Sequence, residues 1–203
     1  MSGSNTYTGG TTLEGTLILG AANTLPSIGV VELSTMNSLL DLNHLNLTIG
    51  NLEGVSGATV NIGMATLTLG DHSTQTFNGT IQGTGTLIKQ NSGTTILTSD
   101  NSATVTGNTQ IIGGTLALAA NGNLSGNTAL SVQAGASFDV SAVTTSPIIS
   151  NLSGAGTVAI GAQNLTLTID SAQIFSGAIT GTGAVIKTGS STLTLSGMST
   201  YTG

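Results

Sequence analysis

The same long segment is written twice in this chain, and this duplication limits the folds available to it. Gly83–Lys89 reads GTGTLIK and returns 98 residues later at Gly181–Lys187 as GTGAVIK. A repeat of this kind is typical of stacked units that contact their neighbours, and not of one globular core. We therefore expect residues 1–203 to form a single elongated domain, with the copies at equivalent stations along one axis. The copies span 5–100 and 101–197, and a truncated third copy occupies 198–203.

A shorter period runs inside each copy. Leu47, Leu67 and Leu87 follow one another at steps of 20 residues, and the step from Leu165 to Val185 has the same length. Steps of about this size are typical of one turn of a β-solenoid. The pattern therefore predicts that these apolar residues lie above one another in successive turns.

Apolar and hydroxyl residues alternate within each step. Residues 66–69 read Thr-Leu-Thr-Leu and residues 165–169 read Leu-Thr-Leu-Thr-Ile, which on a strand places the aliphatic side chains on one face. The 30 glycines stand mostly between such runs, where turns are expected. This predicts an all-β chain with essentially no α-helix.

Many short strands are also compatible with a closed barrel or a sandwich. The near-constant spacing of like residues favours the solenoid, because it lets each leucine stack on the next. With about 22 residues per turn, we expect roughly nine turns and a rod on the order of 45 Å long.

The composition narrows the possible partners. Aromatic residues are only 2% of the chain against 38% hydrophobic residues, so the core must be narrow and aliphatic. The net charge is -6, the only cations are Lys89 and Lys187, and there is no arginine. Nucleic-acid binding and attraction to an anionic membrane both need basic patches, so we expect neither nucleic acid as a partner nor direct membrane insertion.

Disulfides and transmembrane helices are not expected. The chain has no cysteine, which also excludes thiolate metal sites. No run approaches 18 apolar residues, and no signal peptide is recognisable. Residues 1–4, Met-Ser-Gly-Ser, are interpreted as an expression start.

Several runs together resemble a known family. Residues 5–12 read NTYTGGTT, residues 23–27 read NTLPS and residues 40–43 read LDLN. Near the end, residues 192–197 read TLTLSG and residues 199–203 read STYTG. This series resembles the passenger-associated repeat of bacterial autotransporters.

The resemblance implies a fold and a cellular location. It implies a right-handed parallel β-helix in the passenger domain of a protein that crosses the outer membrane of a Gram-negative cell and stays outside or on its surface. In that family the repeats form a stalk that carries or constitutes an adhesin. The second copy departs from the pattern at 103–105 and 146–148, where we expect different loops.

Two histidines raise the question of a metal site. His44 lies near Asp41, and His72 follows Asp71 directly. A stable site needs three or four converging ligands, so we interpret these residues as solvated turn residues and predict no metal site.

Other chemically active residues occupy matching places in the two copies. Asp41 and Asp139 fall between inward apolar neighbours, so a hydrogen bond in a surface turn is expected, with a shared ligand-binding role as the alternative. Lys89 and Lys187 are interpreted as solubilising charges at strand ends, with attachment points or salt-bridge partners as the alternative. The aromatic residues are expected at a corner, for Tyr7 and Tyr201, or in the core, for Phe77, Phe138 and Phe175.

No catalytic motif is present. The sequence lacks a nucleophile elbow, a phosphate-binding loop, a zincin motif and a dinucleotide fingerprint. Solenoid polysaccharide lyases use clustered acids with a strong base, whereas the acids here are dispersed and arginine is absent. We predict a non-enzymatic chain with no catalytic, cofactor-binding or metal-binding residues and no cofactor.

Three functions follow as hypotheses. The first is a structural and adhesive rod that binds a host or cell-surface receptor or a glycan. The second is a subunit that associates head to tail into a filament, because solenoid ends expose strand edges and no cap is recognisable. The third is binding of ice or a regular polymer by outward threonine rows, such as Thr66-Thr68 and Thr166-Thr168.

Overall fold

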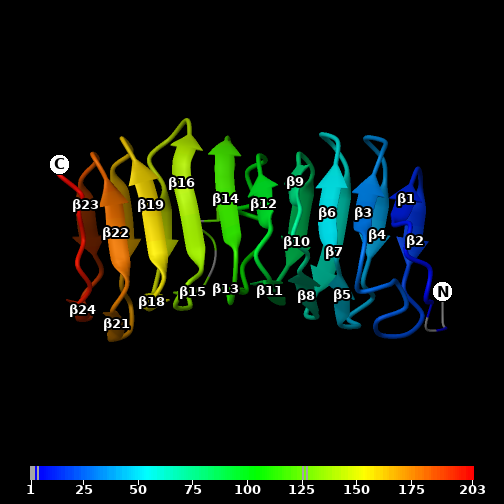
Figure 1. Cartoon of the computed structure of the whole chain (residues 1–203), viewed down its shortest axis with the longest axis horizontal. Helices are drawn as coiled ribbons and strands as arrows, with labels where there is room; N and C mark the ends of the chain where they lie inside the picture. The colour runs from blue at the N-terminus through cyan, green and yellow to red at the C-terminus, as the bar shows by residue number, and fades with distance from the viewer. Residues whose placement is uncertain (1–2, 4, 125, 127) are drawn as a thin grey trace.

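The computed structural model describes residues 3, 5–124, 126 and 128–203. These residues form strands and turns, and none of them is helical. The strands stack in parallel along one axis, with the two chain ends at opposite ends of the rod (Figure 1). The all-β solenoid of about nine turns predicted from the sequence is therefore confirmed. The interpretation of residues 1–4 falls largely on Met1, Ser2 and Ser4, which lie outside the described residues.

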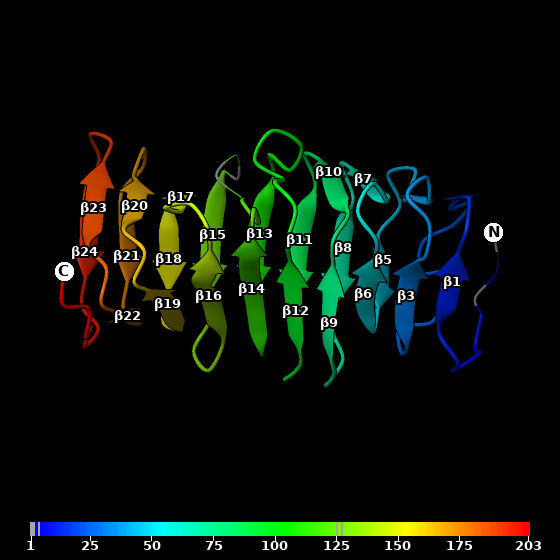
Figure 2. The same cartoon turned by 90° about the horizontal axis from the view of Figure 1, so that it is seen from above.

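Most coils contribute a strand to each of three faces in turn. The strands of successive coils lie side by side along the rod (Figure 2). The first face is a sheet of nine strands, one for each coil. Its strands, in order along the rod, are β1 (Thr11–Leu13), β3 (Val30–Leu33), β6 (Asn51–Gly54), β9 (Thr74–Phe77), β12 (Thr94–Leu97), β14 (Thr115–Ala120), β16 (Ser137–Val143), β19 (Thr157–Gly161) and β22 (Ala178–Gly181).

The second face is divided into two sheets, of four and three strands. The four-stranded sheet belongs to the early coils and contains β2 (Thr16–Ile18), β4 (Leu39–Asp41), β7 (Thr59–Gly63) and β10 (Thr80–Gly83). The three-stranded sheet belongs to the late coils and contains β17 (Ile148–Ser150), β20 (Leu165–Thr168) and β23 (Val185–Thr188).

The third face is a sheet of eight strands. They are β5 (Leu47–Ile49), β8 (Thr66–Leu69), β11 (Thr86–Lys89), β13 (Asn108–Ile111), β15 (Ala129–Val132), β18 (Leu152–Gly154), β21 (Gln173–Phe175) and β24 (Leu193–Leu195).

The core consists of columns of aliphatic side chains, as the 20-residue steps predict. Leu47 pairs with Leu67, and Leu67 pairs with Leu87, on three successive coils. All three are buried. Burying such a side chain contributes about 1.5–3 kcal/mol, so each column stabilises the contact between neighbouring coils.

The GTG motif of the first copy makes a tight corner between β10 on the second face and β11 on the third. The N–H groups of Thr84 and Gly85 both donate to the carbonyl of Gly63 in the coil before, at 2.7 and 2.9 Å. A Cβ on Gly85 would lie 1.9 Å from the carbonyl oxygen of Ala65, so no side chain fits there. The motif recurs because this corner requires a glycine.

The two copies do not occupy equivalent stations, which corrects the expectation from the repeat. Leu67 lies in β8 on the third face, whereas its counterpart Leu165 lies in β20 on the second. Phe77 in β9 likewise belongs to the first face, and its counterpart Phe175 in β21 to the third. From β8 to β20 the chain makes four full coils and passes two further faces. The second copy is therefore rotated about the axis relative to the first.

The second face is interrupted in the middle of the rod. Between β10 and β17, its ladder is reduced to an isolated bridge of Gly83 with Val105, and another isolated bridge joins Asp100 to Asn123 nearby. The sequence predicted different loops at 103–105 and 146–148, and both segments border this interruption.

Candidate functional surface

The outward side chains of the first face form a column of hydroxyl groups over five coils. Each member pairs with the next, and the column consists of Thr74, Thr94, Thr115, Ser137 and Thr157. Because neighbouring strands are about 4.8 Å apart, the hydroxyl groups recur at that spacing along the rod. This regular polar row is exposed or half-buried throughout.

The threonine rows singled out in the sequence are shorter. On the third face, the row of Thr48 and Thr68 continues with Ile88. On the second face, Thr166 stands between Ile148 and Ile186. Isoleucine interrupts the rows of Thr68 and Thr166. Thr66 pairs with Thr86, and Thr168 lies between Ser150 and Thr188, so these hydroxyl rows continue over two and three coils.

Asp41 is the last residue of β4, whereas Asp139 lies inside β16, and each accepts a backbone N–H from two residues further on. Asp41 Oδ1 accepts the N–H of Asn43 at 2.8 Å, and Asp139 Oδ1 accepts the N–H of Ser141 at 2.9 Å. The predicted hydrogen bond is confirmed for both residues, and the predicted turn for Asp41 only. The two carboxylates lie on different faces, in β4 and β16, so the copies do not present them side by side.

The two histidines bind neighbouring coils by hydrogen bonds. His44 Nδ1 accepts the N–H of Met64 at 3.3 Å, and His72 Nδ1 is 2.6 Å from the hydroxyl of Ser92. Asp71 is engaged elsewhere and accepts the N–H and the hydroxyl of Ser73. In the described part of the chain, no three His, Cys, Asp or Glu residues are grouped as a metal ion would need.

Lys89 is buried, and the interpretation of it as a solubilising charge is wrong. Its side chain is 0% exposed, and Nζ donates to the carbonyls of Gln90 and Asn91 at 2.7 and 3.4 Å. Burial lowers the pKa of Lys89, and the nearby charge of Asp71 opposes this shift. Lys187 makes the matching contacts to Thr188 and Gly189 but is exposed, because β23 is the edge strand of its sheet among the described residues.

A buried asparagine that the sequence reasoning missed connects successive coils. Asn51 is 1% exposed, and its Nδ2 donates to Asp71 Oδ1 and to the carbonyls of Ser73 and Thr94. Its Oδ1 accepts the hydroxyl of Thr95 at 2.7 Å. The second copy has an asparagine at the matching place, Asn151, so comparison of the two copies did not single out Asn51. Its full set of partners indicates a structural role.

The aromatic residues divide between the core and the surface. Phe77, Phe138 and Phe175 are buried, as predicted. Tyr201 is half-buried against the core, whereas Tyr7 is exposed, with its hydroxyl 2.5 Å from that of Thr11. The ring of Tyr7 lines an open hollow of about 560 Å³ beside the first coils.

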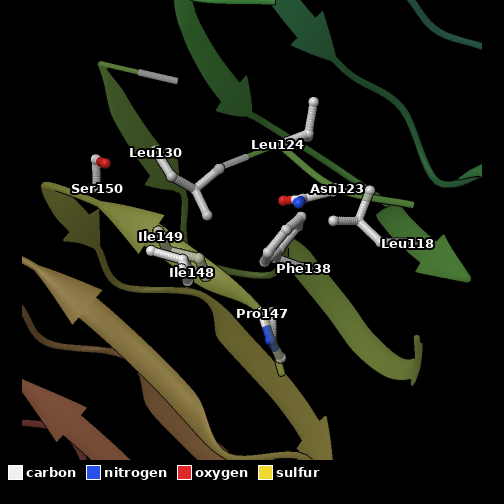
Figure 3. A pocket seen from close by; sticks show the side chains of 9 residues that line it. All are labelled: Leu118, Asn123, Leu124, Leu130, Phe138, Pro147, Ile148, Ile149 and Ser150. Carbon is white, nitrogen blue, oxygen red and sulfur yellow. The ribbon is translucent and has the colours of Figure 1, made fainter. Parts of the chain in front are cut away.

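A small apolar cavity lies at the interruption of the second face (Figure 3). Phe138 and Leu118 line one part of it, and Leu124, Ile148 and Ile149 line the rest. Its volume is about 10 Å³, close to the space of a single water molecule. It is therefore a packing gap between differently built coils and does not have the size of a ligand site.

Nothing in the described residues has the helical length and hydropathy needed to cross a bilayer. Comparison with family models finds no match, and no solved structure matches the chain.

Comparison with curated proteins identifies a relative. The chain is 37% identical over 171 residues to the adhesin BmaC autotransporter of Brucella suis biovar 1 (strain 1330). The alignment covers 84% of this chain but only 5% of that much longer protein. Because the alignment covers 84% of the chain, it includes most of the coils described above. The chain is therefore an autotransporter passenger-like repeat domain.

Proposed function

We propose that this chain is a non-enzymatic structural and adhesive rod, a repeat segment of a secreted surface protein of a Gram-negative bacterium. The observation that carries the proposal is the identity with an adhesin autotransporter over 84% of the chain. The rod shape supports it, because stacked coils hold a contact surface at a distance from the cell.

The placement of the reactive side chains supports a non-enzymatic role. Asp41, Asp139 and His44 each accept a backbone N–H. Lys89 is enclosed in the core. None of these side chains converges with another on a cleft, as acid–base chemistry requires.

The outward surface favours neutral partners. Only 5% of the residues are charged, so long-range ionic attraction contributes little to binding. The column of Thr74, Thr94, Thr115, Ser137 and Thr157 instead presents donors and acceptors at regular spacing. We propose that such hydroxyl rows contact a glycan or a polar receptor surface on the host.

Adhesion of beads coated with the chain to host epithelial cells tests this proposal. The variant Thr94→Val/Thr115→Val/Thr157→Val removes hydroxyl groups from the first face while keeping β-branched side chains. Thr66→Val/Thr86→Val/Thr168→Val is the matched control on the other faces. We expect fewer beads coated with the first variant to adhere to the cells, and beads coated with the control to adhere as the wild type does. The number of adhering wild-type beads should change little between 50 and 500 mM salt. Unchanged bead binding by both variants would exclude the first face as the adhesive surface.

The same segment is also tested in its parent protein. Deleting the segment is expected to reduce surface display or adhesion. If both are unchanged, the proposed function is wrong.

A second candidate function is end-to-end self-assembly. In the described part of the chain, no strand pairs with the outer side of β1 and β2 at one end or of β23 and β24 at the other. Such edges are templates for pairing with another chain. Sedimentation velocity over a range of concentrations tests this, and a single monomer species at the highest concentration would exclude it.

A further inference from the structure

The edge of the rod at which the first-face strands end carries a notch in the middle coils. β9 and β12 are four residues long, whereas β14 and β16 have six and seven residues. On the other side, residues 55–58 form the turn after β6, while only residues 78–79 separate β9 from β10. The upper edge of the rod is accordingly lower over β9 and β12 than over β6 and β16 (Figure 1). Coils flank this notch on both sides along the rod.

A hollow of about 490 Å³ lies in the notch, and polar side chains line its middle. These are Asn78, Thr98 and Ser99, which follow the short strands β9 and β12. The hydroxyl of Thr98 donates to Asn78 Oδ1 at 2.7 Å, and the hydroxyl of Ser99 donates to the Asn78 carbonyl at 2.6 Å. Because both hydroxyl protons are engaged, the two oxygens keep lone pairs that can accept from a ligand.

Two asparagines, two coils apart, present oriented donors to the hollow. Asn121 follows β14 and lines the hollow together with Asn78. Asn121 Oδ1 accepts the hydroxyl of Thr144 at 3.2 Å, as Asn78 Oδ1 accepts that of Thr98. In each case the hydroxyl belongs to the following coil and fixes the amide plane. Both asparagines are exposed, and no acceptor among the described residues binds the Nδ2 hydrogens of either.

The remaining lining residues are small and uncharged. Val55 is 40% exposed and Ala120 is exposed, so both add apolar contacts, and Ser56 adds a hydroxyl group. None of the described residues that line the hollow is charged, so an anionic ligand has no counter-charge there. An apolar ligand would leave the amide and hydroxyl groups without partners. The lining therefore favours a neutral ligand with many hydroxyl groups and small apolar patches, which are the features of sugar rings.

The size of the hollow favours several linked sugars. With strands about 4.8 Å apart, the distance from β6 to β14 is three strand spacings, or about 14 Å. This is longer than one sugar ring. The volume also lies within the range of small-molecule sites, roughly 300–1,000 Å³.

We propose that this hollow binds a neutral oligosaccharide. The amide groups of Asn78 and Asn121 donate to sugar oxygens, and the oxygens of Thr98 and Ser99 accept from sugar hydroxyl groups. This inference rests on the adhesive role proposed above, and it specifies where a glycan binds and which charge class it has. The site is separate from the hydroxyl column of the first face, because Thr74 and Thr94 begin β9 and β12 whereas the hollow lies beyond the last residues of these strands.

Aspartate substitutions test the site. Asn78→Asp/Asn121→Asp keeps the shape of both side chains and the oxygens that accept threonine hydroxyls, but it replaces the Nδ2 donors by carboxylate oxygens. Asn46→Asp/Asn164→Asp is the matched control. Asn46 and Asn164 are also exposed, and each accepts a backbone N–H of the following coil. The control therefore adds the same two charges outside the hollow, and circular dichroism checks that both variants fold.

The probes are printed oligosaccharides. Neutral members are built from galactose, glucose, mannose, fucose and N-acetylhexosamines, and sialylated and sulfated members form the charged set. We expect the wild type and the control to bind the same neutral members. The double variant in the hollow should bind them at least tenfold more weakly, as measured by titration calorimetry with the neutral oligosaccharide that gives the strongest array signal.

Nuclear magnetic resonance locates the bound oligosaccharide directly. The side-chain amide signals of Asn78 and Asn121 are assigned by their loss in the single aspartate variants. Saturation of the wild type with the same oligosaccharide should shift these two signals. The amide signals of Asn46 and Asn164, which lie outside the hollow, should not move.

The outcomes separate this inference from the adhesive role. If the wild type binds no neutral member, or prefers the sialylated or sulfated members, the inference is wrong. Equal binding by the double variant and the control, or unshifted signals of Asn78 and Asn121, would also refute it. None of these results affects the adhesive role as long as beads coated with the wild type adhere to epithelial cells. Failure of those beads to adhere would instead refute the proposed function.

Discussion

At the scale of single residues, the corners of the coils tolerate the least change. Gly85 approaches the backbone of the preceding coil so closely that a Cβ would lie 1.9 Å from the oxygen of Ala65. Backbone in a stacked coil cannot move aside without disturbing its hydrogen bonds. The second glycine of the GTG motif is therefore required because no side chain fits there, as well as by the conformation of the turn.

Gly85→Ala is expected to lower the free energy of unfolding by about 3 kcal/mol, because the methyl group forces two coils apart. Gly15→Ala is the matched control, since a Cβ at Gly15 would have no atom within 4 Å. The control should change stability by less than about 0.5 kcal/mol. Urea denaturation followed by circular dichroism measures both, and equal stability of the two variants would contradict this account.

Lys89 makes stability depend on alkaline pH. Burial lowers its pKa from the ordinary value of 10.5, so as pH rises the folded chain releases the proton before the unfolded chain does. The unfolded state then binds more protons, and this lysine raises the free energy of unfolding as pH approaches 10.5. We expect the wild type to gain stability relative to Lys89→Met over this range in urea denaturation. Lys187→Met is the control and should still gain stability as pH rises. If both lysine variants lose this gain in stability, Lys89 is not its source.

The burial of Lys89 was readable from the sequence in part. In the run Thr86-Leu87-Ile88-Lys89, alternation places Leu87 and Lys89 on the same inward side. Because lysine usually lies in solvent, the sequence interpretation placed Lys89 at the surface despite this alternation. What the sequence did not show were the carbonyls of Gln90 and Asn91, which become acceptors only when the corner is folded.

At the scale of elements, the coil is the unit that can be added or removed. Leu165 on β20 pairs with Val185 on β23, so deleting residues 165–184 joins two equivalent points of the stack. We expect this variant to fold with an unchanged circular dichroism signal per residue. Its rod should be about 4.8 Å shorter when measured by small-angle scattering.

The control for this deletion removes residues 165–174 only. It shifts the remaining strands by half a coil, so their inward columns no longer meet the core. We expect the last coils of the control to lose their circular dichroism signal. Similar behaviour of the two deletions would show that stacking register does not stabilise these coils.

The strand positions were more predictable than their assignment to faces. Steps of 20 residues were enough to align Leu47, Leu67 and Leu87, because each step is one complete coil. The rotation between copies depends on how many faces one copy passes. That number was hidden because the chain forms isolated bridges at Val105 and Asn123 in place of strands.

At the scale of the whole molecule, the repeat makes the rod extendable. Gly203 ends the same motif that Gly9 ends, so residues 1–203 followed by residues 10–203 form a continuous series of copies. We expect this tandem chain to scatter as a single rod of about twice the length.

A tandem in which residues 1–203 are followed by residues 20–203 is the control, because it lacks β1 and β2 of the second unit. It should behave as two rods joined by a flexible segment. If both tandem chains have the same maximum dimension in small-angle scattering, the coils do not continue across the junction.

The interrupted second face affects how such a rod bears load. Pulling along the axis separates coils by breaking the ladders between them, and the resistance grows with the number of hydrogen bonds that must break together. Between β10 and β17 one of the three ladders is nearly missing. A molecule stretched along its axis would unfold there first, while the flanking coils remain intact. Extension of the middle coils would then dissipate a sudden force exerted by flowing liquid.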